Sequence, residues 1–197
     1  MIDLFATPIY KSKVSTDSFE QLQSFIVDCI SKIDPTKVSP YARGNSISLG
    51  GINDNLHSEE VFQPLVNEIV PHIQAYWKEL TYSQYLVPVI KDMWANINYQ
   101  GGKTGIHNHG TFPMSGCIYV NKPIEDMGSI FFIDPRELII SQQPYDMKNW
   151  GSICQSSVET TTGDIILFPG WLKHGVEENK TLTPRVVVGF NMMFKKL

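Results

Sequence analysis

The sequence of 197 residues has few cysteines, no long apolar run and no concentration of positive charge. Its three cysteines, Cys29, Cys117 and Cys154, are scattered and odd in number. They therefore form neither a disulfide framework nor a CxxC metal site, and each is expected to be an ordinary buried thiol. No apolar run is long enough for a membrane helix, and the first residues lack the apolar stretch of a secretory signal. We therefore expect a cytoplasmic protein with no membrane association.

Charge is modest and mixed in sign. The net charge is −4, charged residues make up 18% of the chain, and lysine and arginine do not gather in one segment. A nucleic-acid partner is therefore not expected. The hydrophobic content of 42% is that of a globular protein, and a chain of this length can bury a large core without disulfide bonds.

The N-terminal part, residues 1–85, is expected to be mostly helical. Apolar residues recur at spacings of three and four over 17–33, which is typical of an amphipathic helix. Residues 34–57 are rich in Gly, Asn, Ser and Pro and are interpreted as a loop. A second helical pattern covers 58–80, and the two prolines inside it predict breaks or kinks.

From residue 86 the pattern changes to short apolar or alternating runs that are separated by Gly, Pro, Asn and Asp. These runs are 86–99, 115–121, 129–133, 153–160, 164–168, 175–177 and 185–194. No helical period lies between them, so βαβ units are not expected. We therefore predict a mainly β protein in a single domain, 1–197, with a double-stranded β-helix (jelly roll) over 86–197 and the N-terminal helices packed against it.

Three histidines and one arginine form the most informative pattern. His107 and His109 are one residue apart, so in an extended segment their side chains point to the same face. His174 follows a second short strand, and Arg185 comes eleven residues later. In a jelly roll the ends of distant strands meet around one opening, where three neutral imidazoles can bind a transition metal and leave positions free for small ligands. The arginine indicates an anionic small molecule beside the metal.

An ordered set of motifs covers the C-terminal half densely and the first helices loosely. It consists of LFATP at 4–8, WAN at 94–96, HNH at 107–109, SGCIY at 115–119, GSIFFIDPR at 128–136, GDIILFP at 163–169, His174, and RVVVGFN at 185–191. This set resembles the iron(II)- and 2-oxoglutarate-dependent oxygenases, and more narrowly their small bacterial and phage branch.

The resemblance implies that His107 and His174 are the two histidines of the facial triad. His109 stands where most of the superfamily has a carboxylate, so one negative ligand charge is missing, which should weaken Fe(II) binding. A second interpretation stays open for His109, in which it lies beside the metal or on the substrate side and an oxygen ligand replaces it. Asp134 is interpreted as part of a strand-ending turn.

The resemblance also implies a site for 2-oxoglutarate. Arg185 matches the arginine that binds the distal carboxylate, and Tyr119 matches a tyrosine that donates to the same group. Asn191, on the same strand face as Arg185, and Asn96 and Tyr99 are further candidates for the cofactor site. A glycine on that face is expected to leave room for the ligand.

The implied activity uses Fe(II), 2-oxoglutarate and O2 to hydroxylate a C–H bond, with release of succinate and CO2. The sequence contains no convincing acid–base pair, in agreement with a catalytic centre made by the metal alone. The substrate is expected to be a small molecule or a side chain of a peptide or protein, and the oligomeric state stays open. The loops at 100–114 and 142–151, with Tyr145 and Trp150, are the candidate lids.

Two alternatives remain at this point. The pattern from Gly101 to His109 also matches the start of a cupin motif, but the glutamate expected after the histidine pair is missing and Arg185 has no role. A cupin would act without 2-oxoglutarate. The other alternative is a catalytically silent jelly-roll module that uses its pocket to bind an anionic ligand.

Overall fold

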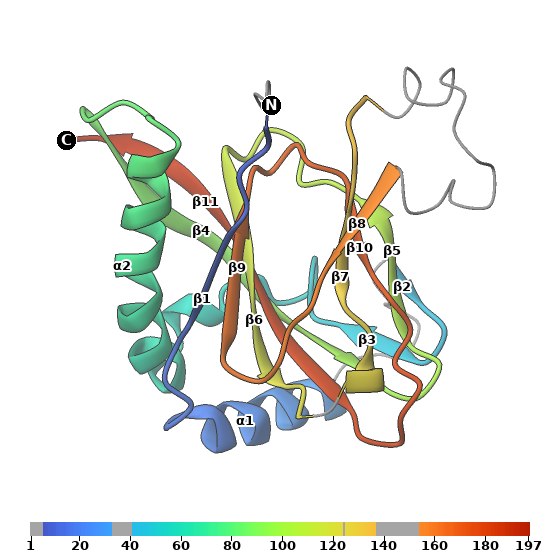
Figure 1. Cartoon of the computed structure of the whole chain (residues 1–197). Coiled ribbons are helices and arrows are strands. Elements are labelled where there is room, and N and C mark those ends of the chain that lie inside the picture. Colours follow the sequence, from blue (N-terminus) through green and yellow to red (C-terminus); the bar gives the residue numbers. More distant parts are fainter. Residues whose placement is uncertain (1–5, 33–40, 124, 137–153) are drawn as a thin grey trace, which may run out of the picture.

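The computed structural model describes residues 6–32, 41–123, 125–136 and 154–197. Two antiparallel sheets face each other (Figure 1), with strand orders β1-β9-β6-β11-β4-β3 and β2-β5-β10-β7-β8. The six-stranded sheet contains β1 (Tyr10–Lys13), β3 (Ser46–Ser48), β4 (Leu86–Asn98), β6 (Met114–Asn121), β9 (Asp164–Phe168) and β11 (Arg185–Lys196). The five-stranded sheet contains β2 (Ala42–Arg43), β5 (Lys103–His107), β7 (Ile130–Ile133), β8 (Gln155–Val158) and β10 (His174–Val176). The predicted mainly β jelly roll with N-terminal helices is confirmed.

Each of the strands predicted after residue 86 is present, whereas four short strands were not predicted. β1, β2 and β3 lie in the part interpreted as helical or loop, and β5 lies inside the 100–114 segment interpreted as a flexible loop. These strands are two to five residues long, and three of them contain lysine, arginine or glycine rather than alternating apolar residues. They form because a distant strand offers its edge, as β9 does to β1 and β10 does to β5.

The two predicted helices are present as α1 (Phe19–Ser31) and α2 (Gln63–Glu79). Two 3-10 turns, Leu56–Ser58 and Glu60–Phe62, precede α2. The expected break at Pro71 is wrong, because α2 continues through this residue. Pro71 is exposed, so the backbone hydrogen bond that it cannot make is missing on the solvent side of the helix. No helix in the described part of the chain is both long and apolar enough to cross a membrane.

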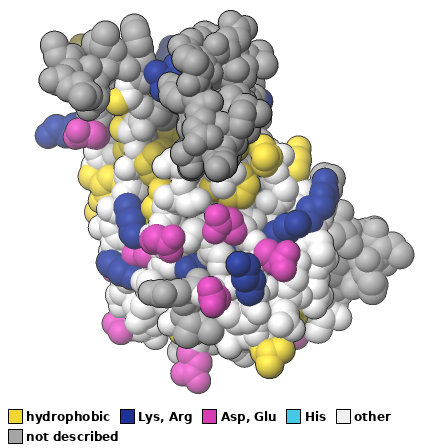
Figure 2. All heavy atoms as spheres, turned by 45° about the vertical axis from the view of Figure 1, so that its right-hand side comes forward, with side chains coloured by type: hydrophobic (Ala, Val, Ile, Leu, Met, Phe, Trp, Pro, Cys, Tyr) yellow, Lys and Arg dark blue, Asp and Glu magenta, His cyan; other side chains and the backbone are white. Residues whose placement is uncertain are grey.

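The helices cover the outer face of the six-stranded sheet, with α2 beside β4 and β11 and α1 at one end (Figure 1). This leaves the space between the two sheets for a second, smaller cluster of buried side chains. On the face in Figure 2, acidic and basic side chains are interspersed, so that face has no extended area of one charge. The layers thus direct the inner faces of β4, β6 and β11 toward the five-stranded sheet, where the histidines lie.

Candidate metal centre

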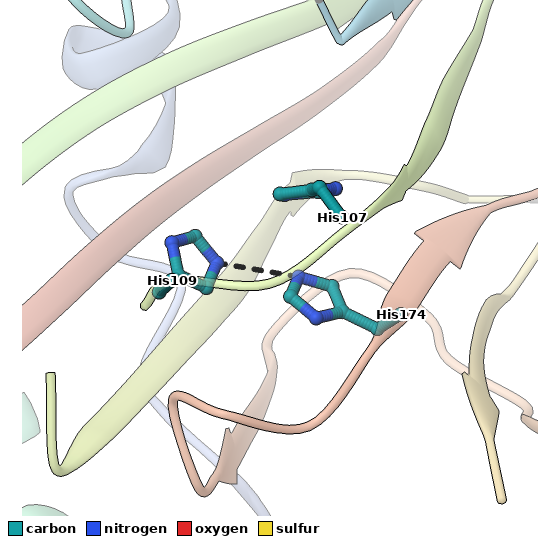
Figure 3. A group of neighbouring side chains, drawn as sticks. All are labelled: His107, His109 and His174. Carbon is teal, nitrogen blue, oxygen red and sulfur yellow. Dashed lines mark hydrogen bonds between the residues drawn. The ribbon is translucent and has the colours of Figure 1, made fainter. Parts of the chain in front are cut away.

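Three histidine side chains meet between the sheets. His107 ends β5, and His174 begins β10 directly opposite it in the antiparallel pair. His109 lies in the turn after β5, and its backbone N–H donates to the Gly170 carbonyl (2.8 Å), which ties this turn to the segment before His174. One ring nitrogen of each histidine lies within 4.8 Å of the other two. Figure 3 shows the three side chains close together, with a nitrogen of His109 facing a nitrogen of His174. The expected convergence of the three imidazoles is therefore present in the fold.

The nitrogen positions suit a shared cation. The Nε2 atoms of His109 and His174 are 3.2 Å apart (Figure 3). Two imidazoles that bind one ion at about 2.1 Å have nitrogens about 3.0 Å apart at a right angle and about 3.4 Å apart at a tetrahedral angle. The Nδ1–H groups of His107 and His174 donate to the carbonyls of Gly105 (2.8 Å) and Leu172 (2.9 Å). Each ring is thereby held in the tautomer whose Nε2 lone pair is free to bind a metal.

Burial keeps these imidazoles neutral. It lowers the pKa of His107, lowers the pKa of His109 to about 3, and lowers the pKa of His174 well below its ordinary value. Charge on His107 would repel charge on the other two rings, which lowers their pKa further. A proton therefore competes poorly for the nitrogens that face one another, and neutral nitrogen is the form that binds a metal.

Aromatic rings surround the histidines. Tyr41 stacks on His107 with ring centroids 4.6 Å apart, and Phe168 lies 4.6 Å from His174. Trp94 of β4 lies 5.7 Å from His109. These rings restrict the orientation of each imidazole and give the site a largely apolar surrounding.

The histidines line a cavity of about 320 Å³ between the sheets. Of the predicted cofactor residues, Tyr119, Asn96 and Asn191 also line it. The remaining lining comes mainly from the inner faces of β3, β4, β6 and β11, and includes Ser46, Ser48, Asp54, Asp92, Trp94, Asn98, Cys117, Val187 and Gly189. A volume of this size lies at the lower end of the range for small-molecule sites.

Arg185 lies behind the wall of this cavity and is fully buried, at 0% exposure. Its Nε and Nη2 donate to Asn98 Oδ1 (3.2 and 3.0 Å), and its Nη1 donates to the carbonyls of Met127 and Glu177. All these acceptors are neutral, and no carboxylate among the described residues forms an ion pair with the guanidinium. Burial lowers the pKa of Arg185, yet arginine stays charged in proteins. Among the described residues the guanidinium therefore has no carboxylate in contact, and the charge of Glu177 acts on it only from a greater distance. A buried cation in this position is costly unless a ligand supplies a closer anion.

Tyr119 supplies a second polar group to the inner end of the cavity. Its side chain is fully buried, and its hydroxyl makes no hydrogen bond of 3.5 Å or less among the described residues, although the Thr160 hydroxyl, which also has no such partner, lies close enough to interact with it. Burial raises the pKa of Tyr119, so the hydroxyl keeps its proton and can donate. An unpartnered buried hydroxyl that lines a cavity is unusual and indicates a polar ligand.

Two residues of this region lie differently from what the sequence led us to expect. Tyr99 follows the last residue of β4, packs against the helix-side core and does not line the cavity. Its backbone N–H donates to the Asn45 carbonyl, where the chain leaves the strand. Gly189 does lie on the ligand-facing side of β11, but a Cβ there would meet the Trp94 indole at 2.8 Å. The room that this glycine leaves is therefore filled by tryptophan.

The sequence reasoning missed Asn98, Asp92 and Asp54, which all line the cavity. Alternation along β4 from Trp94 and Asn96 would have found the first two, because every second residue of a strand shares a face. Asp54 had no such signal, since it lies between the strands. Asp134 lies outside the cavity lining, and its carboxylate pairs with Arg136 (2.7 Å), in keeping with a turn at the end of β7. The expected lid at 142–151, with Tyr145 and Trp150, lies outside the described residues.

The fold and the three convergent imidazoles define a metal-binding protein of the double-stranded β-helix class. The sequence pattern of the family described as "Putative 2OG-Fe(II) oxygenase" matches residues 92–191, a segment that includes all three histidines and Arg185. The chain belongs to this 2-oxoglutarate–Fe(II) oxygenase family. Because the chain belongs to this family, the family assignment is preferred to the cupin alternative.

Solved structures agree with this fold. The alpha-ketoglutarate-dependent epimerase SnoN from nogalamycin biosynthesis is 13% identical, with a TM-score of 0.67 over 95% of this chain and 78% of that one. HygX from Streptomyces hygroscopicus, with nickel and 2-oxoglutarate bound, is 13% identical, with a TM-score of 0.62 over 94% and 82%. A viral collagen prolyl hydroxylase from Paramecium bursaria Chlorella virus-1 is 12% identical, with a TM-score of 0.60 over 93% and 94%. No curated protein sequence matches the chain.

Proposed function

We propose that this protein is an Fe(II)- and 2-oxoglutarate-dependent oxygenase that hydroxylates a C–H bond of its substrate and releases succinate and CO2. The observation that carries the proposal is the combination of two unsatisfied features at one cavity. Three imidazoles that burial keeps neutral converge until the Nε2 atoms of His109 and His174 are 3.2 Å apart, and the buried guanidinium of Arg185 has no carboxylate in contact among the described residues. A metal ion and a dicarboxylate satisfy both at once.

His107, His109 and His174 would hold the iron through Nε2. Three protein ligands on one side leave positions for the co-substrate and for dioxygen. When bound with 2-oxoglutarate, the iron supplies the oxidation of an unactivated C–H bond by dioxygen. The protein's contribution is to orient the rings through the Gly105 and Leu172 carbonyls and to keep the site dry.

Arg185 and Tyr119 would bind the distal carboxylate of 2-oxoglutarate. The Asn98 amide oxygen now occupies two of the arginine's donors, and a carboxylate is the stronger acceptor for a planar guanidinium. Exchange of the neutral amide for the carboxylate would give the buried charge its partner. The Tyr119 hydroxyl would donate to the same carboxylate and so gain the hydrogen bond that it lacks.

Between these groups and the histidines the wall is largely apolar. Across β6 and β11, Tyr119 pairs with Val187 and Cys117 pairs with Gly189. Gly189 is also opposite Trp94 on β4, so this part of the wall extends from the arginine end of the cavity toward Trp94. A co-substrate that bridges the iron and Arg185 would lie along this wall, out of contact with water. That exclusion strengthens the attraction between its carboxylate and the guanidinium.

Hydroxylation is the outcome that makes the fewest demands on the protein, because it needs no side-chain acid or base. SnoN is described as an epimerase, SnoK from the same biosynthesis as a carbocyclase, and the viral enzyme as a hydroxylase. The shared fold therefore supports several outcomes, and the position of the substrate relative to the iron selects among them.

The test is anaerobic reconstitution with Fe(II), followed by measurement of metal content and 2-oxoglutarate binding. We expect one iron per chain in the native protein and none in His174→Ala, with 2-oxoglutarate binding that requires the metal. Exposure to air with cell extract should then yield succinate. Low iron content, or no succinate although 2-oxoglutarate binds, would identify a silent binding module instead.

A further inference from the structure

The inward-facing side chains of β4 divide the cavity into two ends. Asn98 contacts Arg185 at one end of the strand, and Trp94 packs against His109 further along. Asp92 comes two residues beyond Trp94 on the same face and also lines the cavity. Asp92 and Asn98 are six positions apart along the strand, or about 20 Å. The histidines therefore lie between a cationic end and an end that contains a carboxylate.

Asp92 is held in place by neutral neighbours. Asn191, opposite it on β11, donates from Nδ2 to Asp92 Oδ2 at 3.5 Å, the limit of a hydrogen bond. The Asn191 Oδ1 accepts from Ser115 Oγ (2.8 Å), and this contact fixes which end of the amide faces Asp92. Asp92 therefore lines the cavity beside neutral side chains.

A second carboxylate lies beside it. The Asp54 carbonyl accepts from the Met93 N–H (2.7 Å), which places Asp54 next to Asp92 along the edge of β4. Its Oδ1 accepts from the Gly51 N–H (2.8 Å), and the side chain lines the same cavity. Two acidic side chains that come from segments almost 40 residues apart in sequence thus face one end of the site.

These two aspartates lack the cationic neighbours that others in the protein have. Three aspartates elsewhere are paired with basic side chains, namely Asp28 with Lys32, Asp134 with Arg136, and Asp164 with Lys11 and Lys13. Within the described ranges, neither Asp54 nor Asp92 has a basic nitrogen within 4.0 Å, and no lysine or arginine lines the cavity. In the part of the chain that the structure describes, no basic side chain therefore balances this negative end of the cavity.

We propose that Asp92 and Asp54 bind a positively charged ammonium group of the substrate. This inference rests on the proposed function, which requires a substrate on the side of the iron that 2-oxoglutarate does not occupy. Two carboxylates in a partly enclosed cavity favour a cation and disfavour an anionic or carboxylate-rich substrate. The cavity of about 320 Å³ must also hold 2-oxoglutarate, so the space that remains suits only a small amine or a single lysine-like side chain.

The experiment uses the full chain loaded with Ni(II), a redox-inactive substitute for iron, and 2-oxoglutarate. Calorimetry with 2-oxoglutarate alone comes first and tests the proposed function by itself. Cadaverine is then compared with its neutral counterpart 1,5-pentanediol, and Nα-acetyl-lysine methylamide with its Nε-acetylated form. The two pairs distinguish a free amine from a peptide side chain. Each is measured in the native protein, in Asp92→Asn, in Asp54→Asn, in the double variant, and in Asp17→Asn, which removes an exposed charge away from the cavity.

We expect at least one of the charged probes to bind about tenfold or more tightly than its neutral counterpart in the native protein and in Asp17→Asn. That preference should decrease in each single variant and fall to within about twofold of equality in the double variant. Equal binding of charged and neutral probes overturns the proposal. A preference that survives the double substitution also overturns it, and direct ligation of nickel by the amine would give that result. Loss of 2-oxoglutarate binding in the first step would instead refute the proposed function.

Discussion

The amide oxygen of Asn98 accepts hydrogen bonds from both Nε and Nη2 of Arg185, at 3.2 and 3.0 Å, and both side chains are buried. The amide is itself fixed, because its Nδ2 donates to Ser46 Oγ (2.9 Å). A neutral group therefore stands where a guanidinium would bind a carboxylate most strongly. This arrangement keeps the arginine oriented while leaving its charge available to a ligand.

The substitution Asn98→Asp should turn this arrangement into a buried ion pair. We expect the apparent Kd for 2-oxoglutarate to rise about tenfold or more, because the new carboxylate competes for Arg185 and repels the co-substrate. The melting temperature without ligand should not decrease, since the guanidinium gains a partner. Calorimetry and thermal denaturation measure the two effects. Asn67→Asp, on the exposed side of α2, is the matched control, and an unchanged Kd in Asn98→Asp would remove Arg185 from the co-substrate site.

Arg185→Gln keeps most of the side-chain volume and removes the charge. We expect a loss of roughly 1.5–3 kcal/mol in 2-oxoglutarate binding, which corresponds to about 10- to 150-fold in Kd, with metal binding retained. Titration of the Ni(II)-loaded protein with 2-oxoglutarate measures this change. Arg136→Gln, which removes an exposed arginine outside the cavity, should bind as the native protein does. If both variants bind equally well, the arginine has a structural role only.

His109→Asp tests the third ligand. A carboxylate adds the negative charge that most of the superfamily has at this position, so we expect Fe(II) to bind as tightly as in the native protein or more tightly. Metal analysis and the rise in melting temperature on addition of Fe(II) measure the effect, with His174→Ala as the variant that should show no rise. Loss of both iron and succinate formation in His109→Asp would place His109 outside the ligand set.

Gly189→Ala tests the contact behind the metal centre. A Cβ at this position would meet the Trp94 indole at 2.8 Å, so the ring that packs on His109 must move. We expect a destabilisation of roughly 1–3 kcal/mol, as for other overpacked positions, together with a change in tryptophan fluorescence. Gly105→Ala, whose Cβ would have its nearest contact at 3.6 Å, serves as the control. Native stability in Gly189→Ala would mean that Trp94 moves without cost.

Much of the fold was predictable because it depends on local patterns. Alternating apolar residues between turn residues specify strands such as β6 and β11, and apolar spacing of three and four specifies α1. The prediction failed for β1 and β5, whose residues have no apolar alternation and become strands only because β9 and β10 are there to pair with them. It failed at Pro71 because exposure of the ring, which a sequence pattern does not reveal, lets the helix continue.

The sequence by itself indicated which three imidazoles come together, because one intervening residue puts His107 and His109 on one face and His174 follows a recognisable strand and turn. Only the tertiary structure decided how the rest of the cavity is charged. Arg185 is held by neutral acceptors, Tyr99 turns toward the helices, and Asp54 meets Asp92 at the other end. The physical reason is that a side chain's partners come from strands distant in sequence, and their register alone sets which groups meet.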